Sequence, residues 1–288
     1  MSSVDFSQIL NGLHENKVIP YMGPGALFDA TNKLTGEAMP ADSNSLILAM
    51  NNGRPMAPKL MYEFPRAAMN QELKRGRNFL GQFLTKLYGD TEYTRASVHN
   101  WLAEWKPAYV IDVNRDTQLQ DSYADEKHTL ILGLARITAN HFRFKIYHYD
   151  GNHYTEINQE QVDTSLPVLF KPMGSPKPEA NFIASDADYV DYITELMGGF
   201  AIPDFLKEYR KGKQYLLIGL PLNRDSERMV MSDIVHGAAE HKGWVLNKNP
   251  TPKEVRYCKK IGLEILDADI EDLLEATKVA DNFRRYLA

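Results

Sequence analysis

Four short apolar runs of this chain each end in a turn that is polar or contains glycine. The turns are Gly23–Ala26, Asn114–Asp116, Lys171–Ser175 and Gly219–Asp225. Short apolar runs that alternate with helix-period segments are typical of an α/β protein whose mostly parallel sheet is covered on both faces. Ligands of such sheets bind beyond the carboxyl ends of the strands. We therefore expect the four turns to form one ligand-binding crevice.

The remaining segments fit the same alternation. Apolar residues recur at helical spacing in Ser7–Glu15, Phe64–Tyr88, Val98–Trp105, Asp186–Leu196, Pro252–Lys260 and Ile270–Leu287, which are predicted helices. The predicted strands are Val18–Met22, Pro107–Val113, Pro167–Phe170, Gln214–Leu220, Gly243–Leu246 and Gly262–Leu266. Phe142–Tyr149 and His153–Ile157 alternate around an Asp-Gly turn and predict a β-hairpin.

Charge and cysteine content exclude several classes of protein. The net charge of −5 and the pI near 5.9 give no basic surface for nucleic acid or an anionic membrane. No apolar run has the length that a bilayer requires, and the N-terminus lacks the layout of a secretory signal, so we expect a cytoplasmic protein. Cys258 is the only cysteine, which excludes an internal disulfide and a zinc site built from cysteine pairs. We therefore expect no metal.

The turns and their flanking residues, taken in order, resemble the sirtuin-like (SIR2-like) superfamily. Val18–Ala26 is similar to the Gly-x-Gly segment of that family, Val110–Asp116 to its Thr-x-Asn-x-Asp segment and Val168–Ser175 to its Lys-x-His-Gly-Ser segment. Ile183–Ile193 resembles the start of the helix that follows in prokaryotic members, and Leu216–Asp225 resembles their Gly-x-Ser-x-x-Asp strand end. The resemblance covers nearly the whole chain.

The resemblance implies a fold and a ligand. The fold is a single Rossmann-like domain over residues 1–288 with a helical insertion over residues 36–105, and the ligand is NAD or another nucleotide that contains ADP-ribose. The residues that would contact the nucleotide are Gly23, Gly25, Ala26, Asn114, Asp116, Ser175, Gly219, Asn223 and Asp225.

The resemblance also narrows the activity. Sirtuin deacylases carry a four-cysteine zinc ribbon, which a chain with one cysteine cannot form. Members of the stand-alone prokaryotic branch cleave NAD between nicotinamide and ribose, often in bacterial defence. Their activity is associated with an asparagine in the Asn-x-Asp turn and a histidine before Gly-Ser. Asn114 matches the asparagine, whereas Met173 occupies the position of the histidine.

Methionine at position 173 is a poor replacement for a base. Cleavage of the glycosidic bond needs a polar group that positions water and a base near the oxocarbenium-like centre. A thioether has no titratable proton and accepts hydrogen bonds only weakly. Pro172 is a second departure, because proline lacks a backbone donor and fixes φ. His148 and His153 flank a hairpin turn, where side chains are usually solvated, so we do not assign them as substitute bases.

Several of these residues have simpler explanations. Gly23 and Gly25 could serve only to allow a tight turn, and Asn114, Asp116 and Asp225 could cap helices. The first turn lacks the third glycine of a dinucleotide oxidoreductase, which disfavours a dehydrogenase. One group of residues either fills the core of the inserted helices or forms a pliable contact surface: Met50, Met56, Met61, Tyr62, Phe64, Pro65 and Met69.

Two functions remain open. The first is a catalytically impaired SIR2-like protein that binds a nucleotide, a protein or both, and acts as an accessory factor to a partner enzyme or complex. The resemblance admits a metalloenzyme such as nitrogenase as that partner, although no residue supports it. The second is an NAD glycohydrolase (NADase) whose base lies elsewhere. If Phe, Met or Pro side chains fill the crevice between Gly25, Asn114 and Gly219, we expect that no nucleotide binds and that the protein is an interaction scaffold.

Overall fold

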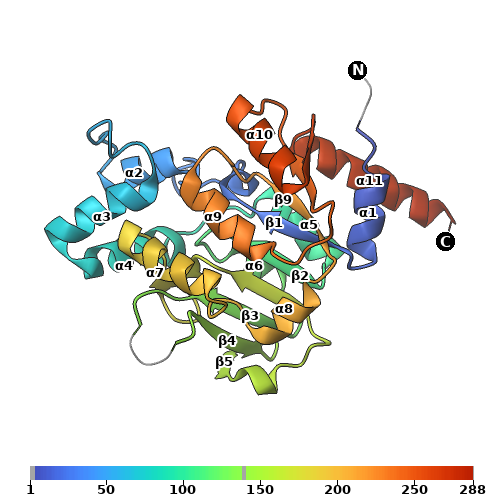
Figure 1. The fold of residues 1–288 in the computed structure, drawn as a ribbon, viewed down its shortest axis with the longest axis horizontal. Helices are drawn as coiled ribbons and strands as arrows, with labels where there is room; N and C mark the ends of the chain where they lie inside the picture. Colours follow the sequence, from blue (N-terminus) through green and yellow to red (C-terminus); the bar gives the residue numbers. More distant parts are fainter. Residues whose placement is uncertain (1–3, 138–140, 288) are drawn as a thin grey trace.

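A nine-stranded sheet runs through the middle of the molecule. The computed structural model describes residues 4–137 and 141–287, and within them the strand order is β11-β10-β9-β1-β2-β6-β3-β4-β5 (Figure 1). All neighbouring strands from β11 to β3 are parallel, which confirms the predicted Rossmann-like α/β class. The strands are β1 (Val18–Met22), β2 (Tyr109–Asp112), β3 (His128–Gly133), β4 (Phe144–Tyr149), β5 (Tyr154–Ile157), β6 (Val168–Lys171), β9 (Gln214–Ile218), β10 (Gly243–Leu246) and β11 (Leu263–Leu266).

Strands are added to the sheet on both sides of the central strand β1. It first builds β2, β3 and β6 on one side of β1, and it later returns to build β9, β10 and β11 on the other side. A reversal of this kind opens a crevice at the carboxyl ends of the strands. The four turns singled out in the sequence follow β9, β1, β2 and β6, which are adjacent in the sheet. The four turns therefore lie at one edge of the sheet, and their predicted role as one ligand-binding crevice stays a prediction.

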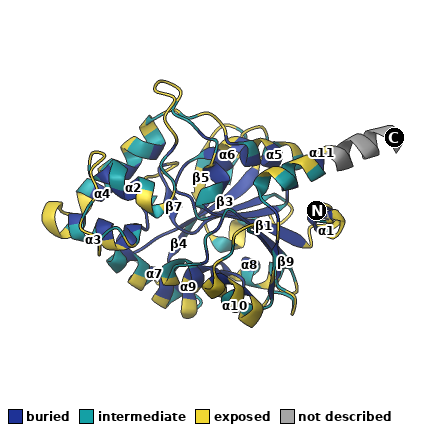
Figure 2. Ribbon diagram, turned by 90° about the horizontal axis from the view of Figure 1, so that it is seen from above, coloured by how far each residue is buried: buried dark blue, intermediate teal, exposed yellow. Residues whose placement is uncertain are grey.

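Alternating strand residues bury two separate cores. One set of side chains packs under α7 (Asp186–Met197), α8 (Asp204–Tyr209), α9 (Asp225–Ile234) and α10 (Pro252–Ile261). The other set packs under α1 (Ser7–His14), α5 (Ser97–Trp105), α6 (Gln118–Ser122) and α11 (Ile270–Leu287). Successive side chains of a strand point to opposite faces, so strands that are covered on both faces must be apolar along their length. Figure 2 shows this buried sheet between helices whose outer sides are exposed.

Three further helices form a small bundle at one end of the sheet, on the left of Figure 1. They are α2 (Ser43–Met50), α3 (Phe64–Arg75) and α4 (Arg77–Thr85), and a single π-helical turn, Lys86–Asp90, follows α4. The predicted uninterrupted helix over Phe64–Tyr88 is wrong. Gly76 has a φ of 84°, which ends α3 and starts α4 at a new angle. Glycine adopts this conformation without the steric cost of a side chain.

The bundle has its own core, and the methionine-rich segment contributes to it. Met50 and Phe64 are buried in this core, and Met56 and Met61 pack against it, which supports core packing for these four residues. The extent of the insertion, residues 36–105, stays a prediction. Within that range, α5 packs on the sheet with the second core.

The hairpin of β4 and β5 is confirmed, because the two strands pair antiparallel at the end of the sheet. β3 was not predicted, and neither was a separate two-stranded sheet of β7 (Gly174–Ser175) and β8 (Asn181–Phe182). In the described ranges, no helix combines the length and the apolar character needed to cross a membrane.

Candidate functional site

The turns after β1 and β9 pack directly against each other. The Gly25 N–H donates to the Gly219 carbonyl oxygen at 2.8 Å, and the Gly23 N–H donates to the Ile218 carbonyl oxygen at 2.9 Å. A Cβ atom on Gly219, whose φ is +63°, would lie 2.5 Å from the nitrogen of Ala26. Close backbone approach therefore requires glycine here. The Ala26 N–H also donates to a carbonyl group, that of Gly23, so none of the three N–H groups is free to hold a phosphate.

Asn114 ties the turn after β2 to the turn after β1. Its side-chain amide donates to the Gly23 carbonyl oxygen at 2.9 Å, and its own N–H donates to Asp112 Oδ1 at 2.9 Å. The side chain is only 5% exposed. The structure thus uses the Asn114 amide group as a cross-link between two loops.

An ion pair between Asp112 and Lys171 lies inside the sheet edge. Ile111 on β2 pairs with Phe170 on β6, so the next residue of each strand lies side by side. Lys171 Nζ is 2.6 Å from Asp112 Oδ2, and both side chains are fully buried. Burial raises the pKa of the Asp112 carboxyl group, and the nearby Lys171 ammonium group opposes that rise.

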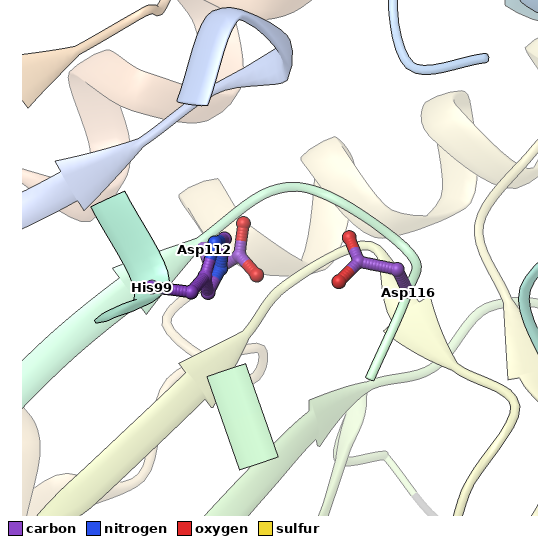
Figure 3. Close-up of side chains that lie close together, drawn as sticks. All are labelled: His99, Asp112 and Asp116. Carbon is purple, nitrogen blue, oxygen red and sulfur yellow. The ribbon is translucent and has the colours of Figure 1, made fainter. Parts of the chain in front are cut away.

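Asp116 and Ser175, both predicted nucleotide contacts, are buried behind the turns. Asp116 Oδ1 accepts from the Gln118 N–H at 2.7 Å, and the Ser175 hydroxyl group accepts from a glutamine side chain of α6 at 2.8 Å. The Asp116 side chain therefore binds a backbone N–H group at the start of α6. This agrees with the simpler explanation that Asp116 caps a helix. Its carboxylate also lies near Asp112 and His99, and Figure 3 shows the three side chains together at the end of β2.

Met173 lies in a small cavity on the α7–α9 side of the turns, which we call the inner cavity. Met173 is 2% exposed. The inner cavity has a volume of about 50 Å³, and Pro24, Phe64, Arg115 and Glu227 also line it. That volume holds a few water molecules at most, whereas a cavity that admits benzene is about 150 Å³. The inner cavity is therefore too small for an aromatic ring.

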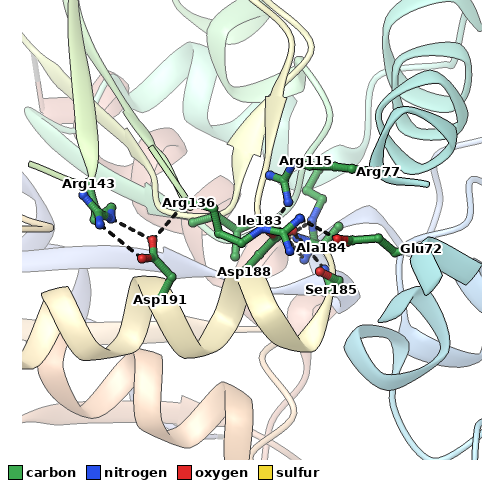
Figure 4. A network of polar contacts seen from close by, with 10 residues as sticks. All are labelled: Glu72, Arg77, Arg115, Arg136, Arg143, Ile183, Ala184, Ser185, Asp188 and Asp191. Atoms are coloured by element: carbon green, nitrogen blue, oxygen red, sulfur yellow. Dashed lines mark hydrogen bonds and ion pairs between the residues drawn. The ribbon is translucent and has the colours of Figure 1, made fainter. Parts of the chain in front are cut away.

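Arg115 occupies the inner cavity from the turn after β2. Its Nε and Nη2 atoms donate to the Ile183 carbonyl oxygen at 2.9 and 2.6 Å, and its guanidinium carbon lies 5.4 Å from the centroid of the Phe64 ring. Figure 4 shows Arg115 reaching this segment just before α7. Arg115 thus fills space between the sheet and the helical bundle.

A buried carboxylate at the start of α7 fixes the bundle over the inner cavity. Asp188 Oδ2 accepts from the N–H groups of Ala184 and Ser185 at 3.0 and 3.1 Å, consistent with the predicted helix start at Asp186. Arg77 of α4 and Arg136 of the loop after β3 both pair with Asp188, as Figure 4 shows. Charge-assisted contacts of this kind restrain the two segments relative to α7.

Among the described residues, Glu227 supplies the one carboxyl group that lines the inner cavity. Its Oε2 atom is buried, and nothing in the described part of the chain hydrogen-bonds to it. Burial, with a further contribution from the nearby Glu63 carboxylate, raises the pKa of Glu227 to about 8. A carboxyl group with such a pKa can carry a proton at neutral pH.

A second, more open cavity lies beyond the ends of β9, β10 and β11, and we call it the outer cavity. Its volume of about 480 Å³ falls within the usual range of small-molecule sites. Gly25, Phe28 and Gly219 form one wall. The residues after β10 and β11 form the other: Leu246, Asn247, Lys248, Asn249, Ala268, Asp269, Ile270 and Glu271.

Four residues considered in the sequence lie away from both cavities. Asn223 and Asp225 line neither of them, and Asp225 is exposed at the first position of α9, where it pairs with Arg228. His148 pairs with Thr129 near the start of β3, at the edge of the sheet opposite the turns. His153, in the same hairpin, is exposed.

The residues that sequence reasoning missed are mostly charged. Lys171 and Asp112 stand in otherwise apolar strands, and a pair of opposite charges in adjacent buried strands is a signal that could have been found. Arg115 and Glu227 stand next to predicted positions, but no local pattern indicates that they face the inner cavity. Phe64 comes from the bundle, and only the tertiary fold brings it there.

The sheet is mostly parallel, and new strands are added first on one side of β1 and then on the other. This topology defines the doubly wound, Rossmann-like class of proteins. The sequence profile of the SIR2-like domain matches residues 108–266, which is more than half of the chain. The chain therefore belongs to the SIR2-like domain family. The matched region runs from just before β2 to the end of β11. No curated protein matches the chain.

Proposed function

We propose that this chain is a catalytically impaired SIR2-like protein that binds the adenosine part of a nucleotide and acts as an accessory factor to a partner enzyme or complex. One observation carries the proposal. The inner cavity is filled by Phe64, Met173 and Arg115, whereas the outer cavity beside Gly25 and Gly219 is open. The proposed setting is the cytoplasm of a bacterial cell.

Three features of the turns and of the inner cavity argue against NAD cleavage. Met173 offers no base, and the side-chain amide of Asn114 already donates to the Gly23 carbonyl oxygen. The volume of about 50 Å³ leaves no room for the nicotinamide ring. Chemistry at the glycosidic bond would therefore require the helical bundle to move away from the turns.

The outer cavity suits a nucleoside better than a phosphate. Phe28 is 49% exposed and offers a ring on which a base can stack. Asp269 and Glu271 can accept hydrogen bonds from ribose hydroxyl groups, the role of an acidic residue in dinucleotide sites. The backbone donors of the first turn are already occupied, so the phosphates of the ligand would extend toward solvent.

Replacement of Phe28 by alanine should weaken the binding of ADP-ribose by about tenfold, because base–aromatic stacking contributes about 1–3 kcal/mol. Calorimetric titration with ADP-ribose, NAD and AMP measures this. Leu34→Ala is the matched control, since Leu34 is 94% exposed and does not line the cavity. If the native chain, Phe28→Ala and Leu34→Ala bound ADP-ribose equally well, the outer cavity would not be the binding site.

Purified protein incubated with NAD should release no nicotinamide above the rate of a blank. If Met173 were the only defect, Met173→His would raise turnover by about 10²–10⁴. Because Phe64 and Arg115 also occupy the inner cavity, we expect no such rise, and Met173→Leu serves as the apolar control. Turnover by the native chain would contradict the impaired-enzyme proposal.

The partner is proposed to be another protein that contacts the helical bundle. Leu73 on α3 is 76% exposed and Tyr62 just before α3 is 42% exposed, which gives the bundle apolar surface.

The second candidate function is an NADase, and the position of Glu227 is the observation that favours it. This carboxyl group lines the inner cavity and has a raised pKa, so it is the residue that would replace the missing base.

A further inference from the structure

Three buried side chains from separate segments converge at the carboxyl end of β2. His99 lies on α5, Asp112 ends β2, and Asp116 lies in the turn that follows. His99 and Asp112 are 0% exposed, and Asp116 is 1% exposed. One ring nitrogen and one oxygen from each carboxylate all lie within 4.8 Å of one another. In Figure 3 the two carboxylates face each other, and His99 lies beside Asp112.

The cluster contains polar atoms that have no partner among the described residues. Nδ1 and Nε2 of His99 and Oδ2 of Asp116 are buried and form no hydrogen bond within residues 4–137 and 141–287. Buried polar groups of native proteins nearly always have a partner, because losing the contact with water is costly. The described residues supply no partner for these atoms, which leaves room for a bound species that satisfies them.

The charges of the cluster are also unbalanced. The Lys171 ammonium group pairs with Asp112 and offsets one of the two carboxylates. Among the ion pairs of the described residues, none involves Asp116. An unpaired buried carboxylate is unfavourable, so a cation beside Asp116 would be strongly stabilised.

We propose that His99, Asp112 and Asp116 hold a divalent transition-metal ion of the zinc type. One imidazole nitrogen and two carboxylate oxygens are ligands that zinc and its neighbours accept, with water in the remaining position. The imidazole nitrogen disfavours magnesium and calcium, which prefer oxygen ligands. Asp112 keeps a lone pair on each oxygen beside its contacts with Lys171 and Asn114.

The three ligand atoms must move toward one another to hold this ion. Metal–ligand distances of about 2.0–2.2 Å place the ligand atoms of a tetrahedral site about 3.3–3.6 Å apart. The ligand atoms of the cluster lie within 4.8 Å of one another, so the side chains must approach by up to about 1.5 Å, through small rotations. A cleft of about 390 Å³ reaches Asp116 from the surface, and its wall also includes Thr117 and Gln118. Asp116 is therefore the member of the cluster that lies nearest to this cleft.

The role of this ion is structural. It joins α5 to the turn after β2, and that turn carries Asn114, which in turn holds the first glycine turn. The site uses no cysteine, which is why the cysteine content alone led to an expectation of no metal. The metal site lies on the α5 side of the turns, opposite the inner cavity. The proposal of a metal ion therefore does not depend on whether the chain binds a nucleotide.

The test is metal reconstitution of the full chain without an affinity tag. Protein stripped with EDTA is supplied with Zn²⁺ or Co²⁺, separated from free metal by gel filtration and analysed by mass spectrometry. We expect one ion per chain, a visible Co²⁺ absorption band and a higher Tm than for the stripped protein. Asp116→Asn, which keeps the acceptor for the Gln118 N–H, should bind at least about tenfold more weakly.

Two further variants make the result decisive. Asp121→Asn changes another partly buried carboxyl group of α6, which bonds to Thr117 outside the cluster, and it should bind Zn²⁺ like the native chain. His99→Gln should lose binding and the Co²⁺ band. If the native chain retains no ion, or if Asp116→Asn and His99→Gln bind as tightly as it does, the cluster holds only a buried water or a proton and the proposal fails.

Discussion

Lys171→Met should lower the free energy of unfolding by about 3–5 kcal/mol, the usual cost of removing one partner of a buried ion pair. Asp112 would then remain fully buried between β2 and its neighbours without a counter-charge. Methionine fills a volume similar to that of the lysine side chain, so the loss would come from the charge and not from a cavity. Urea unfolding at pH 7 in the presence of EDTA measures it, because EDTA prevents a metal ion from replacing the ammonium group.

The double variant Asp112→Asn/Lys171→Met separates the cost of an unpaired charge from the value of the pair. Asparagine keeps an acceptor for the Asn114 N–H, and an uncharged buried pair is often as stable as an ion pair. We expect the double variant to regain most of the loss. Lys211→Met is the control, since Lys211 forms an exposed pair with Glu208 and should change stability by less than about 1 kcal/mol. If Lys171→Met also lowered stability by less than about 1 kcal/mol, the prediction would be refuted.

The sequence was sufficient for most of the sheet, because its strands are short, apolar and ended by turns. β1, β2, β6 and β9 were all placed within two residues of their observed bounds. The antiparallel hairpin followed from its Asp-Gly turn. β3 was missed because His128 and Thr129 interrupt the start of its apolar run. The break at Gly76 was missed because apolar spacing continues across it, whereas the φ of 84° is a property of the backbone.

The site was harder to predict than the sheet, because its content comes from residues far apart in the chain. The glycine turns pack against each other, and the backbone hydrogen bonds of Gly23, Gly25 and Ala26 use the N–H groups that a phosphate would need. Sequence reasoning identified Met173 as an oddity and could not know that Phe64, more than a hundred residues earlier, lies in the same cavity. Local patterns report the backbone, while the contents of a cavity depend on tertiary packing.

The position of Glu227 leads to a prediction with a defined dependence on pH. Its pKa is about 8 in the folded chain, against 4.5 for an ordinary glutamate, so the folded state binds the proton more tightly than the unfolded state. Stability then decreases as pH rises from about 4.5 to about 8, because the folded chain must either keep the proton or bury a charge. The full shift corresponds to about 5 kcal/mol at 1.36 kcal/mol per pKa unit, and partial access of water reduces this to about 2–4 kcal/mol.

Glu227→Gln should therefore be more stable than the native chain at high pH and nearly equal to it at low pH. Glutamine mimics the protonated carboxyl group, so the difference in the free energy of unfolding should grow from near zero at pH 4.5 to about 2–4 kcal/mol above pH 8. Urea unfolding at several pH values measures the difference, and Glu208→Gln, at an exposed residue, should give a flat line. A difference that does not change with pH would mean that Glu227 is charged in the folded protein. In that case the inner cavity holds a water molecule or a cation beside this carboxylate, and the NADase alternative loses the raised pKa that would make Glu227 a stronger base than an ordinary glutamate.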